Sequence, residues 1–178
     1  MIIRNETSSD IEAISKVTIA AFENLAISHH TEQYIINALR EANALTISLV
    51  AEIDGQVVGH IAFSPVTISD GAIDWYGLGP VSVLPEYQKK GIGKFLISEG
   101  LSLLKKLGGQ GCVLVGHPNY YKQFGFQNFP ELIYEGVPLE VFFALPFTEK
   151  VPKGIVVFHE GFLANGIKVM TPDRKKIL

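Results

Sequence analysis

The spacing of apolar residues predicts two helices after a short first strand. Met1 to Arg4 is an apolar run that is typical of a strand. Hydroxyl residues at positions 7–9, with acids at 10 and 12, are typical of a helix start. The apolar residues that follow recur at helical spacing, at Ile11, Ile14, Val17, Ala21 and Leu25. The same spacing predicts a second helix from Thr31 to Glu41.

The middle of the chain has the patterns of three consecutive strands. The segments Thr46 to Ile53 and Gln56 to Ser64 flank the hairpin turn signal Asp54-Gly55. A second Asp-Gly pair at 70–71 precedes another strand pattern, from Ala72 to Leu84. Because short turns join neighbouring antiparallel strands, this part is predicted to be an antiparallel meander.

The second half begins with a strand–helix–strand unit. Gly91 to Leu107 carries an apolar stripe with helical period, and two glycines at 108–109 end it. Cys112 to Val115 is apolar throughout, which predicts a strand buried on both faces. Such a unit is normally a right-handed crossover with parallel strands. A short helix from Pro118 through Phe124 follows, then strands over 139–145 and 154–159.

The elements together predict an α/β (α+β) fold with a mixed central sheet flanked by helices. We assign residues 1–165 to one domain and 166–178 to a C-terminal tail, in which Thr171 to Leu178 is polar and expected to fray. The 178 residues, 47% hydrophobic and 19% charged, agree with a single globular domain.

Charge and cysteine content narrow the class of protein. A net charge of -3 gives no support for a nucleic-acid or acidic-membrane partner. The lone Cys112 excludes an internal disulfide framework and agrees with a reducing compartment. No apolar run is long enough to span a bilayer, and the N-terminus lacks the layout of a signal peptide. We therefore expect a cytoplasmic protein.

The turn Gln88-Lys89-Lys90-Gly91-Ile92-Gly93-Lys94 is the first candidate site. It joins a predicted strand to the start of a predicted helix. Its glycines allow a phosphate to approach the backbone, and the free N–H groups and dipole of a helix start favour an anion. A plain turn whose glycines relieve strain is the alternative. The turn is not a Walker loop, because the spacing before Lys94 is too short, and it lacks the third glycine of a dinucleotide fingerprint.

This turn resembles the pyrophosphate motif Q/R-x-x-G-x-G/A of the GNAT superfamily of N-acetyltransferases. A second segment, Tyr121-Lys122-Gln123-Phe124-Gly125-Phe126, resembles the family motif Y-x-x-x-G-F that follows the fifth strand. The order of elements is similar from Met1 to Phe126. The resemblance implies a single domain whose sheet is splayed around a cofactor site, with acetyl-CoA as co-substrate.

The resemblance also implies roles for individual residues. The strand backbone before the turn would pair with the pantetheine arm, and the amides of the turn would hold the pyrophosphate. Tyr121 would protonate the leaving thiolate. Tyr120 competes for this role, but neighbours in a helix point about 100° apart, so one of the two faces the cofactor. The implied cofactor-binding residues are Val81, Ser82, Val83, Gln88, Lys89, Lys90, Gly91, Ile92, Gly93, Lys94 and Asn119, the last displaced from the family's position.

The general base and a metal site are not assigned by the sequence. The motif strand from Tyr76 to Leu84 has no carboxylate, which leaves Glu52, His60, Asp74 and His117 as candidates, with structural roles as the alternative for both histidines. The histidines at 29, 30 and 159 have no second ligand cluster at zinc-like spacing, so no metal is expected.

We predict an acetyl-CoA-dependent N-acetyltransferase that moves an acetyl group directly to a primary amine of a small molecule or peptide. The alternatives are a non-catalytic acyl-CoA-binding module of the same fold and a nucleotide-binding domain unrelated to CoA. The acceptor is expected opposite the cofactor, over residues 22–32 and 142–162. Its identity, the choice between acetyl and longer acyl groups, and homodimer formation are left open.

Overall fold

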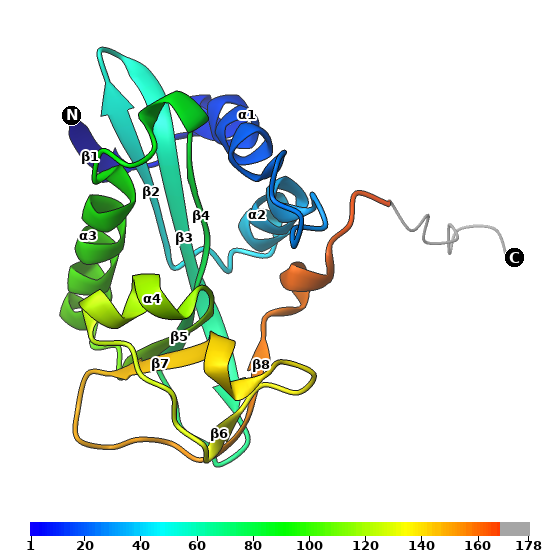
Figure 1. The fold of residues 1–178 in the computed structure, drawn as a ribbon, viewed down its shortest axis with the longest axis vertical. Coiled ribbons are helices and arrows are strands. Elements are labelled where there is room, and N and C mark those ends of the chain that lie inside the picture. Colours follow the sequence, from blue (N-terminus) through cyan, green and yellow to red (C-terminus); the bar gives the residue numbers. More distant parts are fainter. Residues whose placement is uncertain (168–178) are drawn as a thin grey trace, which may run out of the picture.

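One sheet runs through the computed structural model, which describes residues 1–167. Its main strands lie in the order β1-β2-β3-β4-β5-β7 (Figure 1). Their neighbours are antiparallel except for β4 and β5, which are parallel. The bounds of these strands are Ile2–Asn5 (β1), Ile47–Ile53 (β2), Gln56–Ile68 (β3), Trp75–Val83 (β4), Gly111–Val115 (β5) and Phe142–Pro146 (β7). The long strand β3 continues past the main sheet, where it pairs with β8 (Gly154–Phe158), which in turn pairs with β6 (Leu132–Ile133).

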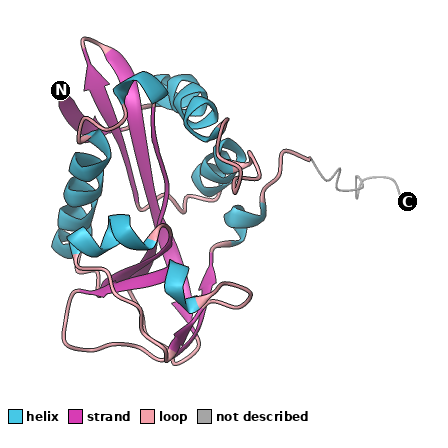
Figure 2. Cartoon of the chain, in the orientation of Figure 1, coloured by secondary structure: helices cyan, strands magenta, loops and turns pink. Residues whose placement is uncertain are grey.

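Helices cover both faces of the sheet (Figure 2). Helices α1 (Ile11–Phe22) and α2 (Glu32–Glu41) lie on one side, and α3 (Ile92–Lys106) lies on the other. The short helix α4 (Pro118–Tyr121) follows β5 and continues as a 3-10 turn over Lys122–Phe124. Further 3-10 turns span Ser8–Asp10, Pro85–Tyr87, Leu139–Val141 and Glu160–Leu163. None of the helices in residues 1–167 is long and apolar enough to cross a membrane.

The main core lies between α3 and the sheet. Leu96, Ile97 and Leu104 of α3 are fully buried against strand residues such as Phe63. Each such side chain stabilises the fold by about 1.5–3 kcal/mol. The Phe63 ring occupies the space where a side chain at Gly100 would begin, which lets α3 lie close to β3. A smaller cluster around Ile14 joins α1 and α2 to the opposite face.

Ion pairs fix the N-terminal elements to the sheet. Arg4 of β1 contacts Asp10, at the start of α1, with 2.7 Å between Nη1 and Oδ2, and it also pairs with Glu52 of β2. Arg40 of α2 pairs with Glu6 at 2.7 Å. Both helices are therefore held against β1 and β2 by charged hydrogen bonds, which are stronger than neutral ones.

The sheet splays between β4 and β5. The two strands are paired only from Trp75 to Gly77 of β4, although β4 continues to Val83. The register between β4 and β3 shifts by one residue around Gly79–Pro80, opposite Ala62. A β-bulge of this kind bends a strand, and Pro80 has no N–H for a ladder. Among residues 1–167, the far half of β4 thus has one edge without a partner strand.

Several predicted elements are confirmed, and some bounds differ. The antiparallel meander and the parallel strands of the crossover are present. Helix α1 ends at Phe22, and Leu25 is 44% exposed rather than part of the apolar stripe. The predicted strand 139–145 begins as a 3-10 turn behind Pro138, and only β7 is extended. Val115 is exposed, so β5 is not buried along its whole length.

Two tertiary effects explain the remaining differences. β3 reaches Ile68, beyond the predicted end at Ser64, because β8 pairs with its last residues. The two-residue strand β6 is too short to give a pattern and exists through its pairing with β8. Most of the predicted tail, residues 168–178, lies outside the described residues.

Candidate active site

The unpaired edge of β4 presents backbone groups at Val81 and Val83. The N–H of Leu84 donates to the carbonyl of Val58 in β3, at 2.9 Å. Successive residues of a strand point their backbone groups to opposite edges, so Ser82 faces β3 while Val81 and Val83 face the open edge. The side chain of Ser82 is buried on the α1 side, with Oγ 3.4 Å from Thr18 Oγ1. Of the three predicted residues, Val81 and Val83 thus offer backbone groups to a ligand.

Gln88 limits what this edge can bind. Its side-chain Nε2 donates to the carbonyl oxygen of Val83 at 3.0 Å. The groups left available on the edge are the N–H and C=O of Val81 and the N–H of Val83. An extended ligand with its own amide groups can pair with such an edge as an added strand.

The turn that follows forms a cradle of backbone N–H groups. Within residues 1–167, no N–H from Lys89 to Lys94 donates a hydrogen bond. Lys89 (φ 61°) and Gly91 (φ 86°) both have left-handed backbone conformations, and Gly91 caps the start of α3. Alternation of left- and right-handed residues directs successive N–H groups into one concavity that binds anions. Of the predicted residues, Ile92 contributes only its backbone, because its side chain is buried.

Positive charge surrounds this cradle. Lys89, Lys90 and Lys94 are exposed, and Lys90 Nζ lies 5.2 Å from the centre of the Tyr87 ring. The dipole of α3 adds to this charge at the same end of the helix. The turn therefore suits a phosphate or pyrophosphate group in both hydrogen bonding and charge.

Helix α4 places its two tyrosines differently. The hydroxyl of Tyr120 lies 3.0 Å from the position that a β-carbon on Gly93 would take, so it is at the mouth of α3. The Tyr121 ring packs against Gly116, the residue after β5, and edge-to-face against Phe126. The two tyrosine rings are nearly perpendicular, at 88°, with centroids 5.0 Å apart. They thus point to different surroundings, as the helical geometry predicted.

Burial raises the pKa of Tyr121 to about 12. Tyr120 and Cys112 also raise the pKa of Tyr121, because each of them can become an anion that would repel the Tyr121 phenolate. A phenol with this pKa keeps its proton at neutral pH and can only donate it to a stronger base. Cys112 is itself fully buried, and burial raises the pKa of its thiol, so it is the inert core residue that its apolar strand implies.

The remaining predicted residue, Asn119, is exposed. Its backbone N–H donates to Nδ1 of His117 at 3.3 Å, so this histidine caps the start of α4. His159 caps a 3-10 turn in the same way, accepting from the N–H of Gly161. Both histidines therefore have local structural roles, and no group of three or more metal-binding side chains occurs within residues 1–167.

Two of the other candidates for the general base, Glu52 and Asp74, lie away from the open edge, whereas His60 is paired with Ser82 across β3 and β4. Glu52 pairs with Arg4 in the hairpin of β2 and β3. Asp74 precedes β4 at the end opposite Val83, in a turn conformation with φ 58°. His60 is fully buried beneath the helices, where its Nε2 lies 2.8 Å from Ser48 Oγ.

His60 belongs to a buried polar network that the sequence did not reveal. Ser48 Oγ donates to Glu6, whose carboxylate also pairs with Arg40. Burial raises the pKa of Glu6, but the nearby His60 ring, at 3.7 Å, and hydrogen bonds from Arg40 and Ser48 outweigh it and lower the pKa overall. Burial lowers the pKa of His60. The network joins β2, β3, α2 and the residue after β1, which come from distant parts of the sequence.

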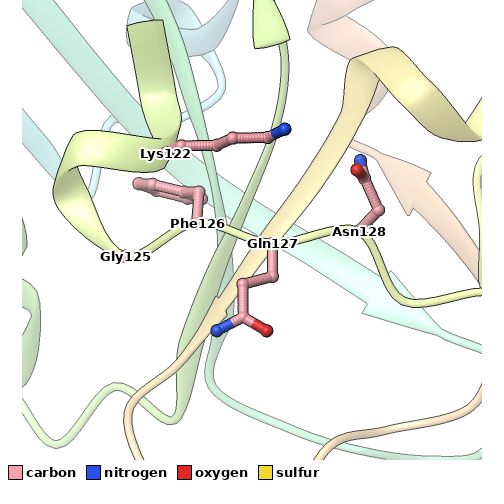
Figure 3. Close-up of a pocket in the computed structure, with 5 residues that line it drawn as sticks. All are labelled: Lys122, Gly125, Phe126, Gln127 and Asn128. Atoms are coloured by element: carbon pink, nitrogen blue, oxygen red, sulfur yellow. The ribbon is translucent and has the colours of Figure 1, made fainter. Parts of the chain in front are cut away.

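A cavity of about 390 Å³ lies beside the Y-x-x-x-G-F segment. It is lined by Lys122, Gly125, Phe126, Gln127 and Asn128 (Figure 3). Lys122 and Asn128 point to one side of the segment, and Gln127 points away from them. The amide of Asn128 donates to the carbonyls of Leu139 and Phe142, so this wall is fixed. Lys122 is the one charged residue among these five.

Comparison with known proteins agrees with this geometry. A family model described as an acetyltransferase (GNAT) domain matches residues 45–128. The uncharacterised N-acetyltransferase YhbS of Escherichia coli is 37% identical over 128 residues, which are 71% of this chain and 74% of that protein.

Two solved structures are similar over nearly the whole chain. A GNAT family acetyltransferase from Brucella melitensis in complex with acetyl-CoA is 49% identical, with a TM-score of 0.81 over 90% of this chain and 97% of that one. The structure of Escherichia coli YhbS in complex with CoA is 31% identical, with a TM-score of 0.84 over 93% of each chain. The chain belongs to the GNAT family of N-acetyltransferases.

Proposed function

We propose that this protein transfers an acetyl group from acetyl-CoA directly to the primary amine of a small molecule or peptide. The observation that carries the proposal is the continuity of two binding features along β4. Within residues 1–167, the backbone groups of Val81 and the N–H of Val83 are free, and after the Pro85–Tyr87 turn they are followed by the unpaired N–H groups of Lys89 to Lys94. An extended arm with amides, ending in a pyrophosphate, is complementary to this arrangement.

Acetyl-CoA supplies an activated thioester, and the chain supplies positions for it. Val81 and Val83 would hold the pantetheine arm, and the cradle around Gly91 and Gly93 would hold the pyrophosphate. The exposed lysines of the turn would balance its negative charge. Complexes of the Brucella melitensis protein with acetyl-CoA and of YhbS with CoA support this assignment.

Tyr121 is the proposed proton donor. Its pKa of about 12 keeps the phenol protonated, and a thiolate that leaves a thioester needs a proton. The hydroxyl of Tyr120, at the mouth of α3, is better placed to contact the cofactor near its phosphates. We therefore propose catalysis for Tyr121 and cofactor binding for Tyr120, and Asn119 stays a predicted contact.

The sequence supports a proposal for the catalytic domain and for the compartment in which it acts. We propose that residues 1–165 form one catalytic domain that acts in the cytoplasm, in agreement with the buried, reduced Cys112. Homodimer formation stays a prediction.

Ligand-dependent melting and release of CoA test the proposed function. Acetyl-CoA should raise the melting temperature, while ATP and NAD should not. A panel of primary amines should then release CoA in a thiol assay. Stabilisation by ATP or NAD alone would contradict the assignment, and acetyl-CoA binding with no release over any amine would favour a non-catalytic module.

A pair of glycine variants tests whether the turn is the binding site. Gly91→Val should weaken acetyl-CoA binding about tenfold or more, because valine is strained at φ 86° and disturbs the N–H cradle. Gly136→Val is the control, because Gly136 has a similar φ of 78° far along the chain. Equal acetyl-CoA affinities of the two variants would exclude the turn.

A further inference from the structure

Asn165 and Gly166 form the one asparagine–glycine pair in the sequence. They follow the 3-10 turn Glu160–Leu163, and both residues are exposed. Glycine is the residue that least hinders attack of its own backbone nitrogen on the side chain before it, because it has no β-carbon. Since both residues are exposed, water can reach the pair. The pair is therefore a candidate for spontaneous chemical modification.

The folded structure holds the Asn165 side chain over the peptide bond to Gly166. Its Oδ1 accepts a hydrogen bond from the N–H of Ile167 at 3.0 Å, which bends the carboxamide back over the main chain. This bond also draws electron density from Cγ, the atom that a nucleophile would attack. The N–H of Gly166 donates no hydrogen bond within residues 1–167, so its proton can be lost to water.

Packing against α2 explains why glycine stands at position 166. Gly166 has φ 78°, a left-handed conformation that favours glycine. A β-carbon here would lie 2.7 Å from the ring of Tyr34 in α2, so a larger residue fits only if that ring moves. Gly161 is packed in the same way against Leu39 of α2, 3.0 Å from the position of a β-carbon. The contacts that dock this segment on α2 therefore also retain the reactive pair.

The other asparagines lie where the same attack is opposed. The next backbone N–H already donates to a carbonyl, at 2.8–3.1 Å, after Asn5, Asn24, Asn43 and Asn119. A bonded N–H gives up its proton less readily. Asn37 lies inside α2, and the side chain of Asn128 is fixed by its bonds to two carbonyls. The fold therefore favours reaction at Asn165 over the other asparagines.

From these contacts we infer that Asn165 deamidates in the folded protein, with isoaspartate as one product. The Gly166 N–H gives its proton to a base in water, and the nitrogen bonds to Cγ of Asn165. The Cγ–Nδ2 bond then breaks, and Nδ2 takes up a proton and leaves as ammonia, which leaves a succinimide ring. Water opens this ring at Cγ to give aspartate, or at the main-chain carbonyl to give isoaspartate, with Gly166 bonded to Cγ. Nothing is oxidised or reduced, and water is the co-reactant.

Peptide mapping of stored protein tests this inference. The full chain is kept folded at mildly alkaline pH and then digested with trypsin. The tryptic peptide 154–168 contains Asn165 as its single amide side chain, so a deamidated form of this peptide is assigned without ambiguity. Chromatography separates its aspartate and isoaspartate isomers. Both should accumulate with time, and faster at higher pH, because the attacking nitrogen must lose its proton. Peptides that contain Asn43 and Asn119 should stay unchanged.

Gly166→Ala should slow the conversion about tenfold or more, because the methyl group hinders the nitrogen. Asn165→Gln should react far more slowly too, and it leaves the packing of Gly166 on α2 intact. Gly136→Ala is the matched control, because Gly136 has the same φ of 78°, and it should leave the rate at Asn165 unchanged. The inference is overturned if peptide 154–168 stays unmodified, if the peptides with Asn43 and Asn119 react as fast, or if Gly166→Ala reacts as fast as the wild type.

Discussion

The ring of Tyr121 lies against the backbone of Gly116, in the space where a β-carbon would stand. Gly116 directly follows β5, and its N–H donates to the carbonyl of Val141 at 2.9 Å, so its backbone is fixed. No side chain larger than hydrogen fits between this backbone and the ring. Gly116 therefore sets the position of the tyrosine that we propose as the proton donor.

Gly116→Ala should lower kcat by about tenfold or more, because the added methyl group overlaps the Tyr121 ring and displaces it. The Kd for acetyl-CoA should stay within about twofold, because Gly116 lies outside the phosphate cradle. Steady-state kinetics and calorimetry measure the two quantities. Val115→Ala, at the exposed neighbouring residue, is the control and should leave both unchanged.

A double-mutant cycle separates a positioning role from a general loss of structure. If Gly116 acts through the tyrosine, Gly116→Ala should add little to the effect of Tyr121→Phe. Full additivity of the two changes in kcat would contradict the positioning role.

Tyr121→Phe should lower kcat about tenfold or more with little change in acetyl-CoA binding, because only the proton donor is lost. Tyr120→Phe should instead weaken acetyl-CoA binding and change kcat less, because its hydroxyl lies at the mouth of α3. The two variants control for each other, since they differ by one position in the same short helix. If Tyr120→Phe lowers kcat and Tyr121→Phe instead weakens acetyl-CoA binding, the proton donor is Tyr120.

The pH profile should reflect the raised pKa of Tyr121. An acid catalyst is active while protonated, and an ordinary tyrosine loses its proton near pH 10. With a pKa of about 12, Tyr121 stays protonated well above that pH. The value of kcat should therefore not decline between about pH 8 and about pH 10.5. A descending limb near pH 10 that disappears in Tyr121→Phe would show that the pKa is not raised.

Asp10→Asn should destabilise the fold at neutral pH. The hydrogen bond from Arg4 holds the pKa of Asp10 well below its ordinary value, against the opposing effect of burial. A depressed carboxyl pKa contributes stability above the unfolded-state pKa and loses it as pH falls. We expect a loss of about 1–3 kcal/mol in the free energy of unfolding at pH 7, which shrinks below about pH 4.

Urea unfolding at the two pH values measures this difference. Glu12→Gln is the control, because Glu12 forms an exposed pair with Lys16 and should have little effect at either pH. A difference between Asp10→Asn and the wild type that persists unchanged at low pH would contradict the role of the Arg4–Asp10 pair.

Local patterns predicted most of the fold. The stripe in α3 and the hairpin signal at Asp54-Gly55 depend on residues close in sequence, and both elements formed as expected. The ends of helices and strands were harder to predict, because the neighbouring elements in the fold help to decide where they stop. β3 continues to Ile68 since β8 lies beside it, and α1 stops at Phe22 although Leu25 keeps the helical spacing.

In the candidate site, too, local features could be predicted from the sequence and long-range contacts could not. The cradle around Gly91 could be predicted because its N–H groups and its glycines are consecutive in sequence. The neighbours of each tyrosine could not, because Gly93 and Gly116 come from different elements. The buried network of Glu6, Ser48 and His60 could not be predicted either, because its members come from distant parts of the sequence.

The sequence by itself therefore determined the elements, the glycine turn at the start of α3 and the family resemblance, all of which depend on short stretches of chain. Only the tertiary structure decided which edge of β4 is free, which surroundings Tyr120 and Tyr121 meet, and where the cavity lies. Each of these depends on side chains and strands that are distant in sequence. Their packing is fixed by the whole core, and no local pattern records it.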